Sequence, residues 1–86
     1  MDYDQRIRST ILNLCKKRGP EKTICPSEVA RNLFPSDWRR HMDEVRREAR
    51  TLAARGDILI TRGSNLLDPN APFGGPIRLR MRLPVE

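Results

Sequence analysis

Hydrophobic residues in the first half of the chain recur at intervals of three and four, the spacing that places side chains on one face of an α-helix. The intervals occur in three segments, which predict helices over residues 4–18, 26–33 and 37–55. The residues of these apolar faces are Ile7, Ile11, Leu14 and Cys15 in the first segment, Val29, Ala30 and Leu33 in the second, and Trp38, Met42, Val45, Ala49 and Leu52 in the third.

The ends of the predicted helices carry residues that commonly start and stop helices. Gly19 supplies a left-handed cap after the first helix, and Pro20 prevents its continuation. Pro26 suits the first position of the second helix, where a missing N–H is no loss. Pro35 separates the second helix from the third, which Gly56 ends. Candidate N-caps are Asp2 or Asp4 for the first helix and Ser36 or Asp37 for the third.

After Gly56 the hydrophobic pattern changes from helical to alternating, which predicts strands over residues 58–62 and 77–83. The second of these strands has an apolar and a cationic side, because apolar residues alternate with arginines. The segment between the strands, residues 63–76, holds three Gly and three Pro and is predicted to be a loop. The short link Thr23-Ile24-Cys25 is expected to add a third, minor strand.

This order of elements predicts a mainly α fold with a small antiparallel β-sheet, a winged helix-turn-helix with three helices and a two- to three-stranded wing. A chain of 86 residues is expected to form a single domain, here residues 1–86, with one modest core. The residues expected in that core are Ile11, Leu14, Val29, Trp38, Met42, Val45, Leu52, Ile58, Ile60, Ile77 and Leu79.

Several segments of the chain resemble a bacterial family of small winged-helix-like proteins described as a domain of unknown function. The most specific are Cys25-Pro26-Ser27-Glu28-Val29-Ala30-Arg31 and Asp37-Trp38-Arg39. The other matching residues are Ile11-Leu12, Arg18-Gly19-Pro20, Thr23-Ile24, Met42, Val45-Arg46, Ala49, Leu52-Ala53, Gly56-Asp57-Ile58 and Gly75-Pro76-Ile77-Arg78-Leu79. The resemblance implies the same fold but carries no activity and no binding residues.

Composition favours a folded, soluble protein, since 37% of residues are hydrophobic and 33% are charged. The N-terminus is acidic and polar, unlike the basic and then apolar order of a signal peptide. No apolar run approaches the roughly 20 residues that span a bilayer. We therefore expect a cytoplasmic protein without a membrane partner.

The formal net charge of +6 attracts polyanions, of which DNA is the first candidate. On a helical wheel five arginines of the third predicted helix, at residues 39, 40, 46, 47 and 50, fall at roughly 80° to 200° from Trp38, and the acidic Glu44 and Glu48 at roughly 240° to 280°. The second helix of a helix-turn-helix enters the major groove, where arginine suits both guanine and phosphate. The candidate DNA-binding residues are Arg39, Arg40, Asp43, Arg46, Arg47 and Arg50.

The alternative for this helix is an ordinary solvated face with internal ion pairs. Asp43 is spaced to pair with Arg46 or Arg47, and Glu44 to pair with Arg47 or His41. An ordinary solvated face would separate basic from acidic residues in the same way as a DNA-binding face, so the sequence leaves both interpretations open.

The last predicted strand supplies a second candidate surface, formed by Arg78, Arg80 and Arg82 on one side. Together with Arg62 these residues form a basic wing surface for phosphates, unless they merely cover apolar surface with their stems. The loop over residues 63–76 contains no Lys or Arg, which argues against ordinary DNA binding by the tip of the wing.

The chain has few residues that are candidates for metal binding or catalysis. Cys15, Cys25 and His41 do not make a four-ligand zinc site, and the cysteines are expected to remain reduced. Trp38 is expected to belong to the core and His41 to its edge, with no nucleophile beside it. We therefore expect no enzyme activity, no metal and no cofactor.

Three functions fit the sequence. The first is a DNA-binding module or small regulator that uses the basic face of its third helix. The second is a protein-interaction module with the same fold and no nucleic acid. RNA binding is the weakest of the three, because Tyr3, Phe34, Trp38 and Phe73 are the only aromatic residues available for stacking on bases.

Overall fold

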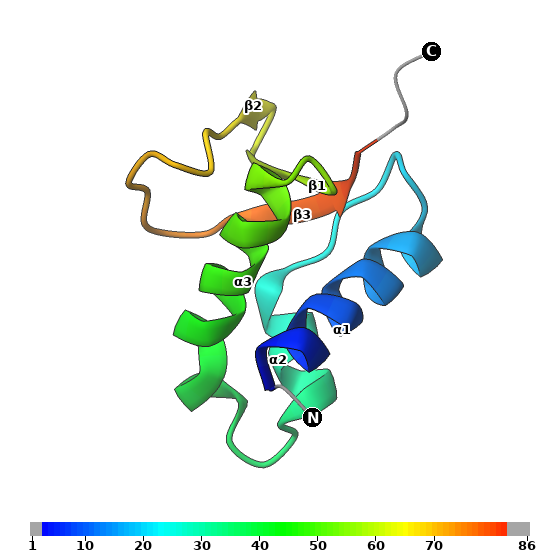
Figure 1. Cartoon of the computed structure of the whole chain (residues 1–86), viewed down its shortest axis with the longest axis vertical. Helices are drawn as coiled ribbons and strands as arrows, with labels where there is room; N and C mark the ends of the chain where they lie inside the picture. The colour runs from blue at the N-terminus through cyan, green and yellow to red at the C-terminus, as the bar shows by residue number, and fades with distance from the viewer. Residues whose placement is uncertain (1–2, 83–86) are drawn as a thin grey trace.

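The computed structural model describes residues 3–82 as a bundle of helices with a small sheet at one end (Figure 1). The predicted mainly α fold with a small antiparallel sheet is confirmed. In chain order the elements are α1 (Tyr3–Arg18), α2 (Pro26–Leu33), the 3-10 helix η1 (Trp38–His41), α3 (Met42–Ala54), β1 (Ile58–Arg62), β2 (Asn65–Leu66) and β3 (Arg78–Met81). The turn that holds η1 lies at the end of the molecule opposite the sheet (Figure 1).

The residues between α1 and α2 confirm two of the predicted helix boundaries, the end of α1 and the start of α2. Gly19 adopts a φ of +98°, in the left-handed region, and its N–H donates to the carbonyl of Cys15 at 3.1 Å. At the start of α2, the N–H of Cys25 donates to the Glu28 carboxylate at 2.7 Å. The expected N-cap Asp4 lies instead inside the first turn of α1, and the alternative Asp2 lies outside the described residues.

The third helix differs from the prediction, because residues 37–55 do not form one continuous α-helix. The chain first makes the 3-10 turn η1, in which the N–H of Arg40 donates to the carbonyl of Asp37 at 3.1 Å, and α3 then starts at Met42. A 3-10 helix has about three residues per turn rather than 3.6. Arg39 and Arg40 therefore deviate from the positions that an ideal α-helical wheel assigns to them.

The sheet has the order β2-β1-β3 and is antiparallel throughout. β1 pairs with β3 from Ile58 opposite Met81 to Thr61 opposite Arg78. The short strand β2 lies inside the segment predicted to be a loop, and β3 is shorter than the predicted 77–83, of which Leu83 lies outside the described residues. The link before α2 joins β3 through a single bridge, in which Ile24 and Leu79 exchange hydrogen bonds of 2.7 and 2.8 Å.

The core collects the apolar faces of the helices and the inner face of the sheet. Eight of the eleven residues predicted for the core are buried, and Leu14, Trp38 and Met42 are half-buried against it. The buried hydrophobic residues are Ile7, Ile11, Cys15, Ile24, Val29, Ala30, Val45, Ala49, Leu52, Ile58, Ile60, Ile77 and Leu79. Within residues 3–82, no helix combines the length and apolar character needed to cross a membrane.

Candidate nucleic-acid interface

The structure divides the nine predicted binding residues into three groups. Arg39, Arg40 and Asp43 lie in η1 and at the start of α3, Arg46, Arg47 and Arg50 lie farther along α3, and Arg78, Arg80 and Arg82 lie in or next to β3. The first group is at the end of the molecule opposite the sheet that carries the third (Figure 1). The nine residues therefore do not form one continuous basic surface.

The first group lies in a cluster that we call the basic turn, formed by Arg31, Trp38, Arg39 and Arg40. The guanidinium of Arg39 lies 4.5 Å from the centre of the Trp38 ring, and that of Arg31 lies 4.4 Å from it. Such cation–π contacts hold an arginine in place without an ion pair. Trp38 is thus half-buried between core and cations rather than a fully buried core residue.

Arg40 is a strongly solvent-exposed member of the basic turn. Its side chain is 82% exposed, and its distance of 4.0 Å to the Asp37 carboxylate is the longest among the ion pairs of the described residues. A pair of this length between exposed groups holds a side chain weakly. The guanidinium of Arg40 is therefore accessible to an external anion.

Arg47, in the middle of α3, is paired within the protein. It lies 3.2 Å from Asp4 of α1 and 3.3 Å from Glu48. The hydrogen bond to Glu48 and the charge of Asp4 raise the pKa of the Arg47 guanidinium above its ordinary value. Of the ion pairs expected along this helix, the structure forms that between Glu44 and His41, at 3.2 Å, whereas Arg47 turns towards α1.

Arg50 is turned towards the long loop that connects β2 to β3. It donates to the carbonyls of Pro69 at 2.9 Å, Ala71 at 2.7 Å and Phe73 at 3.4 Å. Its guanidinium also lies 3.8 Å from the centre of the Phe73 ring. One side chain of α3 thereby fixes the path of five loop residues.

Two further arginines bind the same loop. Arg46 donates to the carbonyl of Gly75 at 3.0 Å, and Arg62 of β1 donates to the carbonyls of Gly74 and Pro76. Together with Arg50 they form what we call the loop clamp. The loop needs no Lys or Arg of its own, because the donors that hold it come from α3 and β1.

We expect the replacement of Arg50 by glutamine to loosen this loop. Hydrogen bonds to charged groups contribute about 1.5–3 kcal/mol each, and glutamine is too short to reach the same carbonyls. The Ala71 amide, which is bonded to the Asp68 carbonyl at 3.1 Å, should then exchange its hydrogen roughly thirtyfold faster. Hydrogen exchange followed by NMR measures this rate.

Arg55→Gln is the matched control for that experiment. Arg55 follows α3, and its guanidinium makes no hydrogen bond or ion pair with other residues of the 3–82 segment. Equal exchange rates in the Arg50→Gln and Arg55→Gln variants would contradict the role given to the clamp.

The arginines of β3 differ in their contacts. Arg78 donates to the Thr23 hydroxyl at 2.8 Å and to the Thr23 carbonyl at 3.1 Å, and so joins β3 to the link before α2. Arg80 is half-buried, and Arg82 is exposed just beyond the strand. With Arg62 in the loop clamp and Arg78 bound to Thr23, the basic wing surface predicted from the sequence is reduced to Arg80 and Arg82.

Cys15 is buried in the core, and His41 is half-buried beside Phe34. Burial raises the pKa of the Cys15 thiol to about 11, so it stays protonated at neutral pH. The ring nitrogens of His41 face Asp37 at 3.5 Å and Glu44 at 3.2 Å, and the ring stacks on Phe34 at 3.7 Å between centroids. No group of three His, Cys, Asp or Glu side chains within residues 3–82 is placed to hold a metal ion.

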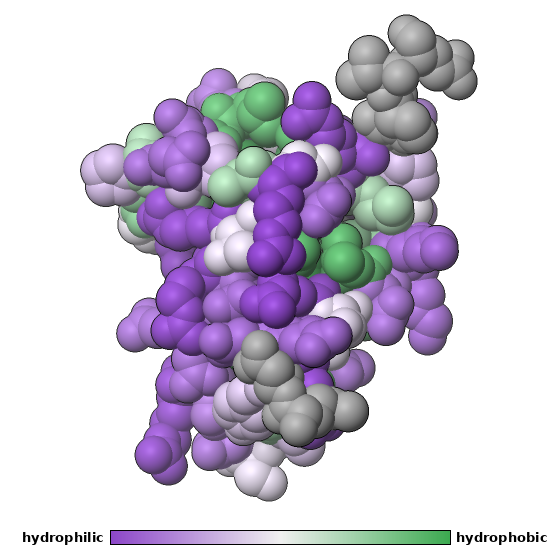
Figure 2. Space-filling view, viewed as in Figure 1, coloured by the Kyte–Doolittle hydropathy of each residue, from purple (hydrophilic) through white to green (hydrophobic). Residues whose placement is uncertain are grey.

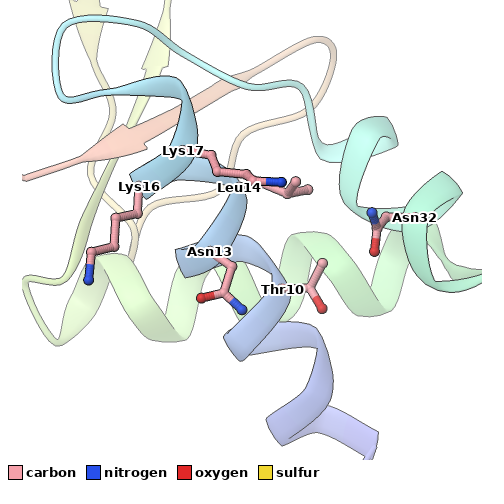
Figure 3. A pocket seen from close by; sticks show the side chains of 6 residues that line it. All are labelled: Thr10, Asn13, Leu14, Lys16, Lys17 and Asn32. Atoms are coloured by element: carbon pink, nitrogen blue, oxygen red, sulfur yellow. The ribbon is translucent and has the colours of Figure 1, made fainter.

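A groove of about 590 Å³ lies between α1 and α2 (Figure 3). Thr10, Asn13, Leu14 and Lys17 of α1 lie across from Asn32 of α2. The lining of the groove combines hydroxyl, amide, amine and apolar side chains.

Sequence reasoning missed Arg31 as a candidate, and it missed the loop contacts that Arg62 and Phe73 make. Arg31 joins the basic turn from α2, and Arg62 acts in the loop clamp. The ring of Phe73 packs against the guanidinium of Arg50. The sequence contains a signal for Phe73 alone, as a large apolar residue in a polar loop. The other two depend on how α2 and β1 lie against neighbouring elements.

Comparison with protein families gives one match, to a family model with the description "Protein of unknown function (DUF3253)". The match covers residues 4–82, from the first turn of α1 to the residue after β3. Comparison with curated proteins gives no significant match. The resemblance to a domain of unknown function is thereby confirmed over nearly the whole chain.

Proposed function

Because the chain belongs to the DUF3253 family, described as protein of unknown function, we propose its role from its geometry: a winged helix-turn-helix module that binds DNA. In this proposal the protein has no catalytic site of its own. The basic turn and the first turn of α3 approach the DNA, and the sheet acts as the wing.

The order and pairing of the elements support this proposal. α2, a short turn and the helical segment from η1 into α3 follow one another as in a helix-turn-helix. β1 and β3 form an antiparallel pair, and Ile24, from the link between α1 and α2, bridges to the outer edge of β3. A minor strand between the first two helices that joins a two-stranded wing is the arrangement expected from the sequence.

The observation that carries the proposal is the accessibility of the cations in the basic turn. Arg40 is 82% exposed with only a distant carboxylate, and Arg39 lies against Trp38. A guanidinium over an aromatic ring keeps its in-plane N–H groups available for phosphate or guanine. The N-terminal residues of the recognition helix lie closest to the base edges in a helix-turn-helix, and Arg39, Arg40 and Asp43 occupy that position.

The arginines farther along α3 have a lesser part in this proposal than the sequence suggests. Arg46 and Arg50 already donate to loop carbonyls, and Arg47 already contacts two carboxylates. Each of them would have to exchange an internal partner for a phosphate. We therefore assign the first DNA contacts to Arg39 and Arg40.

Fluorescence anisotropy with a short labelled DNA duplex at two salt concentrations tests this assignment. The Arg39→Gln/Arg40→Gln variant should bind more weakly and with a flatter salt dependence. Each lost phosphate contact removes about 0.9 from the logarithmic slope, so the slope should fall by about 1.8. The control is Lys16→Gln/Lys17→Gln, which removes the same charge from the C-terminal end of α1, away from the basic turn (Figure 1).

Three outcomes would contradict the proposal. Absence of binding by the wild-type protein at low salt, where non-specific attraction is greatest, removes the DNA function altogether. Equal losses in the two double variants show that only net charge matters. Loss of binding in Arg46→Gln/Arg47→Gln with full binding in Arg39→Gln/Arg40→Gln moves the interface to the middle of α3.

A further inference from the structure

The outer face of the sheet combines exposed apolar residues with arginines. In the pairing of β1 with β3, Leu59 lies opposite Arg80, and Ile60 and Leu79 point to the core. Leu66 of β2 pairs with Thr61 and is 63% exposed, more than Tyr3, the other exposed large hydrophobic residue of the described chain. Figure 2 shows a hydrophobic patch over β2, next to hydrophilic surface.

This face is hollowed, and we call the depression the sheet hollow. It has a volume of about 300 Å³. Its lining residues are Pro20, Leu59, Leu66, Arg80, Met81 and Arg82. Four of the six are apolar and the other two are cations, so none of the described residues that line the hollow carries a carboxylate.

Arg80 brings a buried polar atom without a partner into this hollow. Its Nε is buried, and it donates no hydrogen bond to any of residues 3–82. Buried N–H groups in folded proteins are nearly always bonded, and an unpaired one gains strongly from any acceptor that reaches it. A carboxylate is the best acceptor, since it forms charge-assisted and bidentate bonds with a guanidinium.

We propose that the sheet hollow docks an acidic, apolar peptide segment of a partner protein. A carboxylate of that segment accepts from Arg80, and a neighbouring apolar side chain packs against Leu59 and Leu66. Arg82, at the rim, adds attraction for the same acidic segment. This surface is separate from the basic turn, at the opposite end of the molecule, and its role does not depend on DNA binding (Figure 1).

Two other occupants fit the hollow less well. A second copy of the chain docked through the same face would bring the arginines of β3 against their counterparts, and like charges facing each other oppose association. A DNA backbone would satisfy Arg80 but would leave Leu59 and Leu66 against hydrated phosphates. An acidic and apolar peptide uses both kinds of residue in the hollow.

Selection from a displayed random-peptide library tests the proposal. The library is selected on the full wild-type chain and depleted on an Arg80→Met/Leu66→Ser variant, whose thermal melt is first shown to match the wild type. Methionine keeps the apolar stem of Arg80 and removes its donors. The enriched peptides should contain Asp or Glu next to Leu, Ile or Phe.

Fluorescence anisotropy with an enriched, labelled peptide then measures separately what Arg80 and Leu66 contribute to peptide binding. Arg80→Met and Leu66→Ser should each raise the Kd about tenfold, whereas Arg55→Met, a matched loss of an exposed arginine, should leave it unchanged. Enrichment of no discriminating peptide, or of peptides without acidic residues, would overturn the proposal. It would equally be overturned if Arg80→Met weakened duplex DNA binding as much as Arg39→Gln/Arg40→Gln, because the hollow would then be a DNA contact.

Discussion

Replacing Leu52 by alanine is expected to lower the free energy of unfolding by about 2–5 kcal/mol, the range measured for such truncations in packed cores. Leu52 is 1% exposed and lies in the core between α3 and its neighbours. Natural domains are stable by about 5–15 kcal/mol, and small ones fall near the lower end. The variant should therefore be only marginally folded, as chemical denaturation monitored by circular dichroism will report.

Leu66→Ala is the matched control for this substitution. It removes the same atoms from a side chain that is 63% exposed, so the change in stability should remain within about 0.5 kcal/mol. If the two alanine variants unfold at the same denaturant concentration, the core described above is incorrect.

Removal of the Glu48 carboxylate should have the second large effect. Glu48 is 4% exposed and pairs with Arg8 of α1 at 2.6 Å and with Arg47 at 3.3 Å. Loss of one partner from a buried pair costs about 3–5 kcal/mol because the other charge remains buried. Arg8 retains some contact with solvent, so we expect Glu48→Ala to lower the free energy of unfolding by about 2–3 kcal/mol.

Two further variants separate the contribution of the buried Arg8–Glu48 pair from that of the exposed Arg47–Glu48 pair. Arg8→Met/Glu48→Met removes both charges and should recover most of the loss, since a well-packed apolar pair often replaces a buried ion pair without penalty. Arg47→Met removes only the exposed partner and should lower the free energy of unfolding much less than Glu48→Ala. A larger loss for Arg47→Met than for Glu48→Ala in urea denaturation would refute this account of the contact between α1 and α3.

The elements that could be predicted from the sequence are those specified by local chemistry. Gly19 and Pro20 end α1 because of their own backbone preferences, and the alternation around Leu79 predicts a half-buried strand whatever lies beside it. The 3-10 start of the third helix could not be predicted in this way. Arginine and histidine at residues 39–41 are compatible with either helix type, and packing of the turn decides between them.

The candidate site could be predicted less well, because its arginines have partners that leave no pattern in the sequence. A helical wheel sorts Arg46 and Arg50 onto one face but does not show that loop carbonyls lie against that face. It also places Glu48 on a polar flank, whereas the packing of α1 buries this residue beside Arg8. Of the six candidates in the third predicted helix, Arg39, Arg40 and Asp43 are those that the structure leaves open to a partner.

The loop clamp has a consequence for how the protein tolerates mutation. Arg46, Arg50 and Arg62 bind main-chain oxygens, which every amino acid carries, so the clamp depends on the path of the loop rather than on its side chains. We therefore expect most loop positions to tolerate substitution, while the constraint falls on the three arginines, which lie outside the loop, and on Phe73. The loop is thereby a place where related chains can acquire new surface chemistry without giving up its shape.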